Sequence, residues 1–243
     1  MHSLTGRVRL LGKDKTKEEG LRVKEKTRKM KDSGVEWIGE VPEERMVFPL
    51  GIFFDERKEK VSDLNFEPLS VTKKGIVKQL DDAAKSNSHD NRKKVCKGDF
   101  VINSRSDRKQ SCGLSAFEGS VSVINIVLKN KALNSGFVKY LLDNYGFAEE
   151  FYRWGTGIVD DLWSTRFDKM KRIMLPYPST EEQYAIGKFL DSKVSLIDET
   201  IEKTKKSIED YKKYKQSLIK GTVTKGLNPD VEMTDSGIEW IGE

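Results

Sequence analysis

The 243-residue sequence contains little cysteine and histidine and no long hydrophobic run. Its two cysteines, Cys96 and Cys112, form no CxxC pair, and only His2 and His89 are available to join them. Structural zinc sites need four such ligands at short spacings, so we interpret both cysteines as reduced thiols. No apolar stretch approaches the ~20 residues that span a bilayer, and the N-terminus lacks the apolar core of a secretion signal. The sequence therefore predicts a soluble, cytoplasmic protein without a zinc site.

The motifs of nucleic-acid-modifying enzymes are also missing. A nuclease needs carboxylates clustered around a metal ion, and Asp55-Glu56-Arg57-Lys58 has no well-placed second acidic partner. An amino-group methyltransferase carries an Asn/Asp-Pro-Pro-Tyr/Phe tetrad, from which Asn228-Pro229-Asp230 departs, and a glycine-rich cofactor loop. Gly155-Thr156-Gly157 is too short for a phosphate-binding loop, and no Ser-His-Asp set is compelling. We therefore predict no active site, metal or cofactor in this chain.

Positive charge is concentrated in two parts of the sequence, although the net charge is only +5. Residues 1–31 hold 11 Lys and Arg against 4 Asp and Glu and lack aromatic residues, which is typical of a flexible basic arm. Residues 57–109 hold 14 Lys and Arg against 8 Asp and Glu. This second concentration indicates either a polyanion-binding face or an ordinary solvated surface.

Between residues 41 and 177 the pattern is that of a mixed α+β domain. Short segments of strand character are separated by turn signals. The predicted strands are Met46–Phe54, Glu67–Val71, Asp99–Asn103, Leu114–Phe117 and Ser120–Leu128. The last is rich in β-branched residues and is predicted to be central in a sheet. The apolar spacing of Ser135–Tyr152 predicts one helix with Ser135 as its cap.

A heptad pattern follows the domain. Apolar positions recur at alternating steps of four and three residues over four heptads, with two polar interruptions. They are Leu190, Val194, Ile197, Ile201, Thr204, Ile208, Tyr211, Lys215 and Leu218. Ser179 or Thr180 can cap the start within a capping box, and Gly226 is a stop signal. The pattern predicts a helix of roughly 40 residues, about 60 Å long, whose stripe packs against a second helix. The simplest interpretation is a coiled-coil dimer.

The sequence contains an internal repeat. Residues 32–40 read DSGVEWIGE, and residues 235–243 read DSGIEWIGE, so the copies differ at one position. Chance does not give such identity, and the sequence therefore contains one complete unit and the opening of a second. In each copy a Trp and an Ile follow an Asp-Ser-Gly turn, which predicts a short strand or anchor that packs its Trp.

These features, in this order, resemble the DNA-specificity (S) subunit of type I restriction–modification systems. The resemblance rests on DSGVEWIGEVPE, on the GDFVIN motif at 98–103, on Gly155–Gly157 and on the 175–229 segment from LPYP and EEQ to QSLIKGTVTKGLNP. It covers about residues 31–243. Family members usually carry two recognition domains, each followed by a long helix, and the two helices pair antiparallel. This chain has one of each and resembles a half-size S subunit.

The resemblance implies an α+β fold in which a globular target-recognition domain precedes a long coiled-coil helix. The implied organisation is a basic arm at 1–31, the DNA target-recognition domain at 32–178, a spacer and dimerisation helix at 179–226, and the start of a second repeat unit at 227–243. The implied partners are double-stranded DNA, methyltransferase (modification) subunits, a restriction or motor subunit, and a second copy of the chain. S-adenosylmethionine, ATP and Mg would then belong to the partners. Two alternatives stay open: an inactive truncated S subunit, and a dimeric coiled-coil scaffold that binds only protein.

Lys and Arg side chains are expected to contact phosphates, and polar side chains to read bases in the major groove. The candidate DNA-binding residues are Lys73, Lys74, Lys78, Arg92, Lys93, Lys94, Ser104, Arg105, Ser106, Arg108, Lys109, Thr156 and Arg166. Arg105 is the first choice for reading guanine, because its planar fork fits O6 and N7. Trp154 and Trp163 are interpreted as core residues rather than base-stacking residues. The candidate dimerisation or partner residues are Leu190, Val194, Ile197, Ile201, Ile208, Tyr211 and Leu218.

Overall fold

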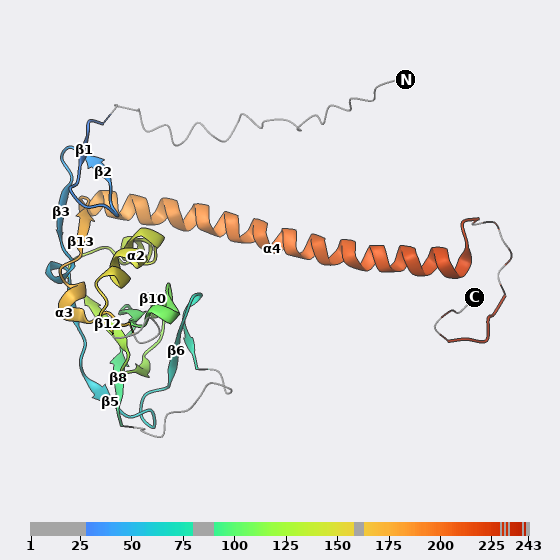
Figure 1. Ribbon diagram of the computed structural model, residues 1–243, viewed down its shortest axis with the longest axis horizontal. Coiled ribbons are helices and arrows are strands. Elements are labelled where there is room, and N and C mark those ends of the chain that lie inside the picture. The colour runs from blue at the N-terminus through green and yellow to red at the C-terminus, as the bar shows by residue number, and fades with distance from the viewer. Residues whose placement is uncertain are drawn as a thin grey trace.

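The computed structural model describes residues 28–79, 90–157, 163–228, 230, 232, 234–239 and 241. A β-rich globular domain precedes one long helix, α4 (Thr180–Lys225), which projects away from the domain (Figure 1). The predicted α+β class with a long C-terminal helix is confirmed. Most of the predicted basic arm, residues 1–27, lies outside the described residues. Within the described segments, no helix has both the length and the apolar character needed to cross a membrane.

All paired strands run antiparallel, in a four-stranded sheet, a three-stranded sheet and three two-stranded pairs. The four-stranded order is β10(Cys112–Leu114)-β9(Phe100–Asn103)-β12(Asn125–Asn130)-β4(Phe54–Glu56), and the three-stranded order is β11(Gly119–Ser122)-β8(Arg92–Val95)-β5(Lys60–Val61). The two-stranded pairs are β1(Met30–Asp32) with β2(Glu40–Pro42), β3(Met46–Pro49) with β13(Met174–Tyr177), and β6(Leu69–Thr72) with β7(Gly75–Lys78). The shorter helices are α1(Ser135–Leu142), α2(Tyr145–Arg153) and α3(Phe167–Met170), with 3₁₀ turns at η1(Leu50–Ile52) and η2(Ser106–Arg108).

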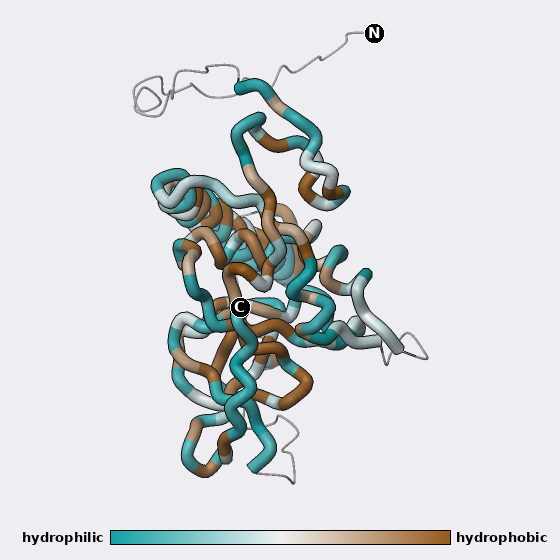
Figure 2. Tube along the Cα trace, turned by 90° about the vertical axis from the view of Figure 1, so that its left-hand side faces the viewer, coloured by the Kyte–Doolittle hydropathy of each residue, from teal (hydrophilic) through white to brown (hydrophobic). Residues whose placement is uncertain are grey.

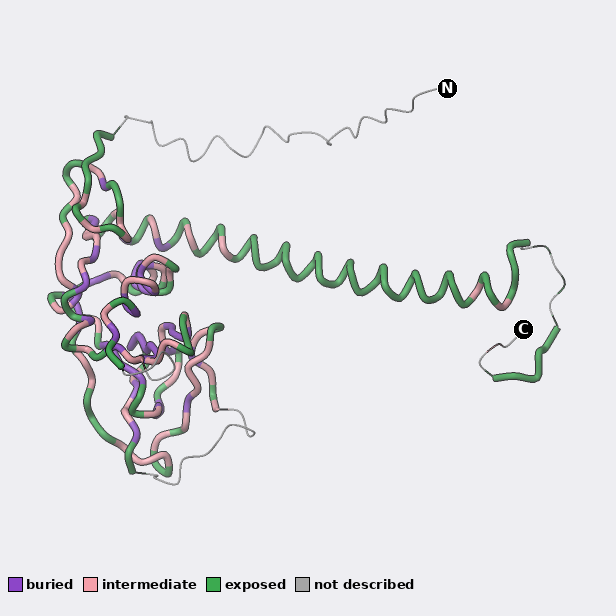
Figure 3. The backbone as a smooth tube through the Cα atoms, in the orientation of Figure 1, coloured by how far each residue is buried: buried purple, intermediate pink, exposed green. Residues whose placement is uncertain are grey.

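Strands β9 and β12 separate two hydrophobic cores. Phe100 and Ile102 of β9 belong to the larger core, and Val101 between them belongs to the smaller core. Leu128 and Val127 of β12 divide in the same way, as the two-residue period of a strand requires. Each such fully buried side chain stabilises the folded state by about 1.5–3 kcal/mol. Because these two strands contribute such side chains to both cores, they form the centre of the domain. In Figure 2 the hydrophobic segments are concentrated inside the domain, and in Figure 3 the buried residues are concentrated in the domain rather than along α4.

The segment Ser120–Leu128 was expected to be one central strand, and that prediction is wrong. Strand β11 ends at Ser122, a two-residue turn follows at Val123 and Ile124, and β12 begins at Asn125. β11 pairs with β8, whereas β12 pairs with β9 and β4 in the other sheet. The β-branched composition signalled strand throughout, but pairing with partners in two different sheets forces a turn in its middle.

A single helix over Ser135–Tyr152, with Ser135 as its cap, is also a wrong prediction. Two helices replace it, and the caps are Asn134 and Asn144, one residue before each helix. Asn134 Oδ1 accepts a hydrogen bond from the backbone N–H three residues later at 3.1 Å, and Asn144 Oδ1 does the same at 2.8 Å. The apolar spacing continues across the break, so the period alone does not reveal it. The Asn side chain provides the alternative hydrogen bond that starts a new helix.

The first copy of the repeat is a Trp-anchored turn between β1 and β2. Gly34 N donates to Asp32 Oδ1 at 2.9 Å, and Val35 N donates to Ser33 Oγ at 3.2 Å. The Trp37 ring packs edge-on against Phe147 of α2, with 5.9 Å between the ring centroids. The anchor predicted for this Trp is therefore present.

Local hydrogen bonds of the second copy match those of the first. Gly237 N donates to Asp235 Oδ1 at 3.0 Å, and Ile238 N donates to Ser236 Oγ at 3.2 Å. Trp240 lies outside the described residues. The Asp-Ser-Gly turn is thus encoded locally, because it forms in both sequence contexts.

The start of α4 is fixed to the domain by polar and close-packed contacts. Ser179 Oγ accepts from Glu182 N at 3.2 Å, as an N-cap does. Gln183 is buried; its Oε1 accepts from Asn134 N, and its Nε2 donates to Pro178 O, both at 2.9 Å. One turn later, a Cβ on Gly187 would lie 3.0 Å from the backbone of Gly136 in α1. The missing side chain at 187 therefore permits α4 to contact α1.

A second link lies one turn further along α4. Tyr140 Oη donates to Asp191 Oδ1 at 2.7 Å, and Lys139 Nζ lies 3.2 Å from the same oxygen. The hydrogen bond from Tyr140 holds the pKa of the Asp191 carboxyl below its usual value. Beyond Val194 the residues of α4 are exposed up to Lys220, and the helix leaves the domain behind (Figure 3). Its 46 residues correspond to about 69 Å at 1.5 Å per residue.

We expect Gly187→Ala to destabilise the protein, although alanine favours helix. The gain in helix propensity is about 1 kcal/mol, whereas forcing a methyl group against the α1 backbone costs ~1–3 kcal/mol. Gly221→Ala is the matched control on the same helix, because a Cβ there meets nothing within 4 Å. Urea unfolding followed by circular dichroism should move in opposite directions for the two variants. Equal shifts in both would contradict the close contact of α4 with α1.

Candidate nucleic-acid interface

The GDFVIN motif anchors the loop that precedes β9. Gly98 has a φ of +88°, which a side chain would strain. The buried carboxylate of Asp99 accepts from Arg57 Nε at 2.7 Å and Nη2 at 3.2 Å, and also from Cys96 N at 2.9 Å. The hydrogen bond to Asp99 raises the pKa of the Arg57 guanidinium. The Gly-Asp part of the motif therefore holds the start of β9 in place.

The end of the same motif positions Arg105. Asn103 Oδ1 accepts from Arg105 N at 3.0 Å, and Asn103 O accepts from Tyr152 Oη at 3.0 Å. Burial raises the pKa of the Tyr152 phenol, so this group stays a hydrogen-bond donor. The Arg105 side chain is 41% exposed, and its Nε lies 3.0 Å from Asp107 Oδ1. The backbone of Arg105 is thus fixed while its guanidinium remains at the surface.

Two segments that are far apart in the sequence meet at Ser164. Thr156 and Ser164 exchange backbone hydrogen bonds of 3.0 and 3.1 Å, and Arg105 forms a β-bridge with the same serine. Gly155 makes this approach possible, because a Cβ there would collide with the Trp163 ring. The two glycine-containing segments that the sequence singled out therefore lie side by side, although residues 158–162 lie outside the described residues.

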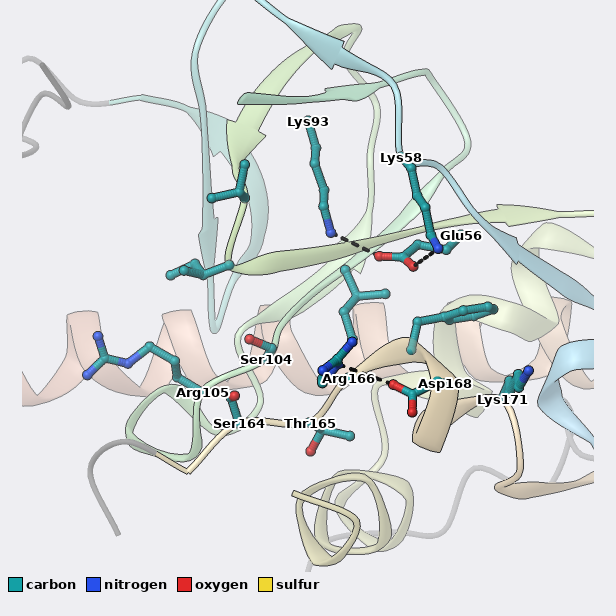
Figure 4. A pocket seen from close by; sticks show the side chains of 14 residues that line it. Glu56, Lys58, Lys93, Ser104, Arg105, Ser164, Thr165, Arg166, Asp168 and Lys171 are labelled. Atoms are coloured by element: carbon teal, nitrogen blue, oxygen red, sulfur yellow. Dashed lines mark hydrogen bonds and ion pairs between the residues drawn. The ribbon is translucent and has the colours of Figure 1, made fainter. Parts of the chain in front are cut away.

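A cavity of about 640 Å³, the first cavity, opens beside this junction (Figure 4). Its cationic side chains outnumber its acidic ones by five to two. Two lysines share the carboxylate of Glu56: Lys93 Nζ lies 3.0 Å from Oε1, and Lys58 Nζ lies 3.6 Å from Oε2. On the opposite side, Arg166 Nε lies 3.4 Å from Asp168 Oδ1. The other cationic residues of the lining are Arg105 and Lys171.

A second cavity, of about 610 Å³, adjoins the first. It is lined by basic and amide side chains, among them Arg108, Gln79 and Asn91. Arg105 lines both cavities, and so do Val123 and Ile124 of the β11–β12 turn. The two cavities are therefore two sides of one continuous surface, which we call the basic face.

Several predicted DNA-binding residues come together on this face. Lys93, Ser104, Arg105 and Arg166 line the first cavity, and Arg108 lines the second. Ser106 and Lys109 line a third hollow of about 440 Å³, where Lys109 Nζ lies 3.1 Å from Glu149 Oε1. The prediction that these residues bind DNA stays a prediction, but those that line the first two cavities share the basic face.

Other predicted residues lie elsewhere. Lys78 pairs with Glu67 at 3.0 Å, and Lys94 pairs with Glu59 at 3.0 Å. Lys73 and Lys74 occupy the turn between β6 and β7. Lys74 is close enough to α4 that its charge helps Lys205 lower the pKa of Glu202. Thr156 is used in its backbone pairing with Ser164 and lines none of the three cavities.

Arg92 was expected to contact phosphate from the surface, but it is buried. Its Nε donates to Ser120 Oγ at 2.8 Å, and its Nη2 donates to Ser120 O at 3.1 Å. Burial lowers the pKa of this guanidinium, although arginine remains charged at neutral pH. Arg92 therefore holds β8 against β11, and it also lines the second cavity. The prediction that it contacts phosphate stays a prediction. The sequence placed it in a basic run and gave no sign that it is mostly buried.

Sequence reasoning missed four residues of the basic face. Lys58 belongs to a charged segment that was set aside as a nuclease motif, Lys171 stands in a segment that carried no motif, and tertiary structure brings both to the first cavity. Val123 and Ile124 were assigned to the interior of a strand, yet they are 37% and 43% exposed. The available signal for Lys58 was the basic surplus of residues 57–109, which does not say which side chains share a face, and Lys171 lies outside that range.

Chemically, this surface suits a polyanion. Its side chains offer ammonium and guanidinium donors with amide and hydroxyl groups between them. In the part of the chain that the structure describes, no three His, Cys, Asp or Glu residues are placed to hold a metal ion. The arrangement is that of a binding surface in which cations surround polar and apolar contact residues.

Comparison of the sequence with protein-family models and with curated proteins gives no match. Comparison of the structure with solved structures gives matches. One neighbour belongs to a structure described as showing the complex assembly and conformational transition of the type I R-M system. The two chains are 13% identical and superpose with a TM-score of 0.58, and the match covers 77% of this chain and 47% of the neighbour. Another neighbour is the HsdS subunit from Thermoanaerobacter tengcongensis. It is 13% identical to this chain and superposes with a TM-score of 0.54, and the match covers 79% of this chain and 52% of the neighbour. This chain thus spans about half the length of the structures it matches, and it has the fold of type I restriction–modification S subunits.

Proposed function

We propose that this chain is a DNA-sequence-specificity subunit of a type I restriction–modification complex and carries one target-recognition unit. The observation that carries the proposal is the attachment of one basic face to one long rigid helix. The face supplies contacts for a single DNA half-site. The helix supplies a spacer whose length is set by its number of residues rather than by a flexible linker.

The exposed stripe of α4 supports pairing with a second copy of the chain. Leu190 and Val194 are half-buried near the domain, whereas Ile197, Ile201 and Ile208 are between 44% and 56% exposed. Tyr211 and Leu218 continue the stripe. Apolar residues at heptad spacing on a wet helix need a partner helix to cover them. Antiparallel pairing of two identical chains would place the basic faces at opposite ends, so that the dimer recognises a bipartite palindrome with a nonspecific spacer.

Under this proposal the chain positions other subunits and catalyses nothing itself. Methyl transfer from S-adenosylmethionine would take place on modification subunits, and ATP- and Mg-dependent restriction on a motor subunit. Mapping of methylated adenines in cells with and without this chain tests the assembly. The expected result is a bipartite palindrome that is methylated only when the chain is present. A protein-binding scaffold would leave the methylation pattern unchanged.

Arg105→Ala should weaken binding to the mapped site by ~1–3 kcal/mol and relax discrimination at one base position. The guanidinium is the exposed donor fork that lines both cavities, so its loss removes a base contact rather than the fold. The measurement is fluorescence anisotropy on duplexes with each base of a half-site replaced in turn, at two salt concentrations. Arg172→Ala is the matched control, because Arg172 is exposed and lines none of the three cavities. Undiminished discrimination at all positions in the Arg105 variant would reject its role.

Ile201→Asp combined with Ile208→Asp should convert a dimer into a monomer. Pairing would bury two unpaired carboxylates, at a cost of several kcal/mol, so the seam cannot close. The control is Ser195→Asp combined with Ser217→Asp, which adds the same charge on the opposite side of α4 and should leave the dimer intact. Sedimentation velocity measures the outcome. A dimeric double-Ile variant, or a monomeric wild-type chain, would refute pairing through the seam.

A further inference from the structure

The turn between β11 and β12 presents two apolar side chains in the middle of the basic face. Val123 and Ile124 line both cavities, and each is more than one-third exposed. Among the exposed large hydrophobic residues described before α4, they are the only two that are adjacent in the sequence. Exposing a neighbouring pair of this kind loses the free energy that their burial would provide.

Local turn chemistry also disfavours these residues. Turns of two residues select Gly, Asn, Asp or Ser, because those residues accept the required backbone angles or bond to the backbone themselves. β-branched residues do neither, and they prefer strands. Among the described residues, Gln110 is the only non-glycine residue with a positive φ, so Val123 and Ile124 occupy ordinary negative-φ conformations. Val123 and Ile124 therefore gain neither the side-chain-to-backbone bonds of usual turn residues nor burial, and a local preference broken without compensation is a sign of function.

The turn is held rigidly on both sides. Asn125, which is buried, donates from Nδ2 to Ser122 O at 3.1 Å and so closes the turn with its side chain. Lys93 Nζ donates to Asn125 O at 2.9 Å while pairing with Glu56. The two apolar side chains therefore stand at fixed positions between the cations of the two cavities, and little conformational entropy is lost when they make contact.

We propose that Val123 and Ile124 read thymine through its 5-methyl group in the major groove of each half-site. This inference rests on the proposed function and names one of its specificity determinants. Cations on either side suit the phosphates that border a groove. The thymine methyl is the apolar group that the major groove of DNA presents, and apolar side chains are its contact partners. A rigid two-residue tip is narrow enough for a groove that admits a two-stranded ribbon.

The test replaces each thymine of the mapped half-site with deoxyuridine, which removes only the methyl group. Wild-type protein should lose about three- to tenfold in affinity at one or two positions. A variant with Val123→Ser and Ile124→Ser should bind the thymine and deoxyuridine duplexes equally. Its salt dependence should remain that of the wild type, because the phosphate contacts are untouched. Leu64→Ser is the control, since Leu64 is 79% exposed and lines none of the three cavities.

Serine suits a turn, so the double variant is expected to fold, and circular dichroism checks this. If it does not fold, the single variant Ile124→Ser removes one of the two apolar contacts and gives the same comparison. Wild-type affinity that is indifferent to deoxyuridine at all thymines would overturn the inference, as would equal losses in the wild type and the variant. In either case specific binding itself would persist. Failure of the wild-type chain to bind any mapped site would instead refute the proposed function.

Discussion

A buried amide joins the two parts of this molecule. Gln183 is 1% exposed, and both ends of its side chain are bonded to backbone groups of the domain, Asn134 N and Pro178 O. An unpaired buried amide costs about 1–3 kcal/mol, so this arrangement tolerates little rotation of the helix about its own axis. The contact of Gly187 with Gly136 fixes the distance between α4 and α1. Together they make a domain and a projecting helix into one rigid unit.

The sheet of the domain holds the loops of the basic face in fixed positions. Strands β9 and β12 are packed on both faces, so their ends, rather than their surfaces, are where exposed residues emerge. Asn103 is the last residue of β9, Arg105 follows it, and Val123 and Ile124 precede the start of β12. Because β9 and β12 are neighbours in one antiparallel sheet, the end of one and the start of the other lie at the same edge. The basic face is a consequence of that pairing.

The charge on the face is arranged so that the protein itself neutralises only part of it. Glu56 lies beside two lysines, and the five cations of the first cavity face two carboxylates of its lining and a third, Asp107, beside Arg105. The pair of Arg166 with Asp168 is exposed and contributes about 0–1 kcal/mol, so it orients the guanidinium without fixing its choice of partner. A phosphate can therefore compete for Arg166. The pair of Lys93 with Glu56 is more enclosed, with side chains 15% and 12% exposed. The buried pair of Asp99 with Arg57 is different, since removing either partner would leave a desolvated charge.

Sequence alone determined whatever depends on neighbours along the chain. The heptad stripe predicted α4, Ser179 capped it, and the Asp-Ser-Gly turn formed in both copies, because these features need only local hydrogen bonds or a helical period. The sequence also singled out two separate glycine-containing segments, the 98–103 motif with Arg105 after it and the 155–157 loop. Only tertiary structure decided that these segments meet, that Arg92 is mostly buried, and that Ser120–Leu128 turns at Val123. Those outcomes depend on which strands pair across the sheets, and pairing between distant segments leaves no periodic trace in the sequence.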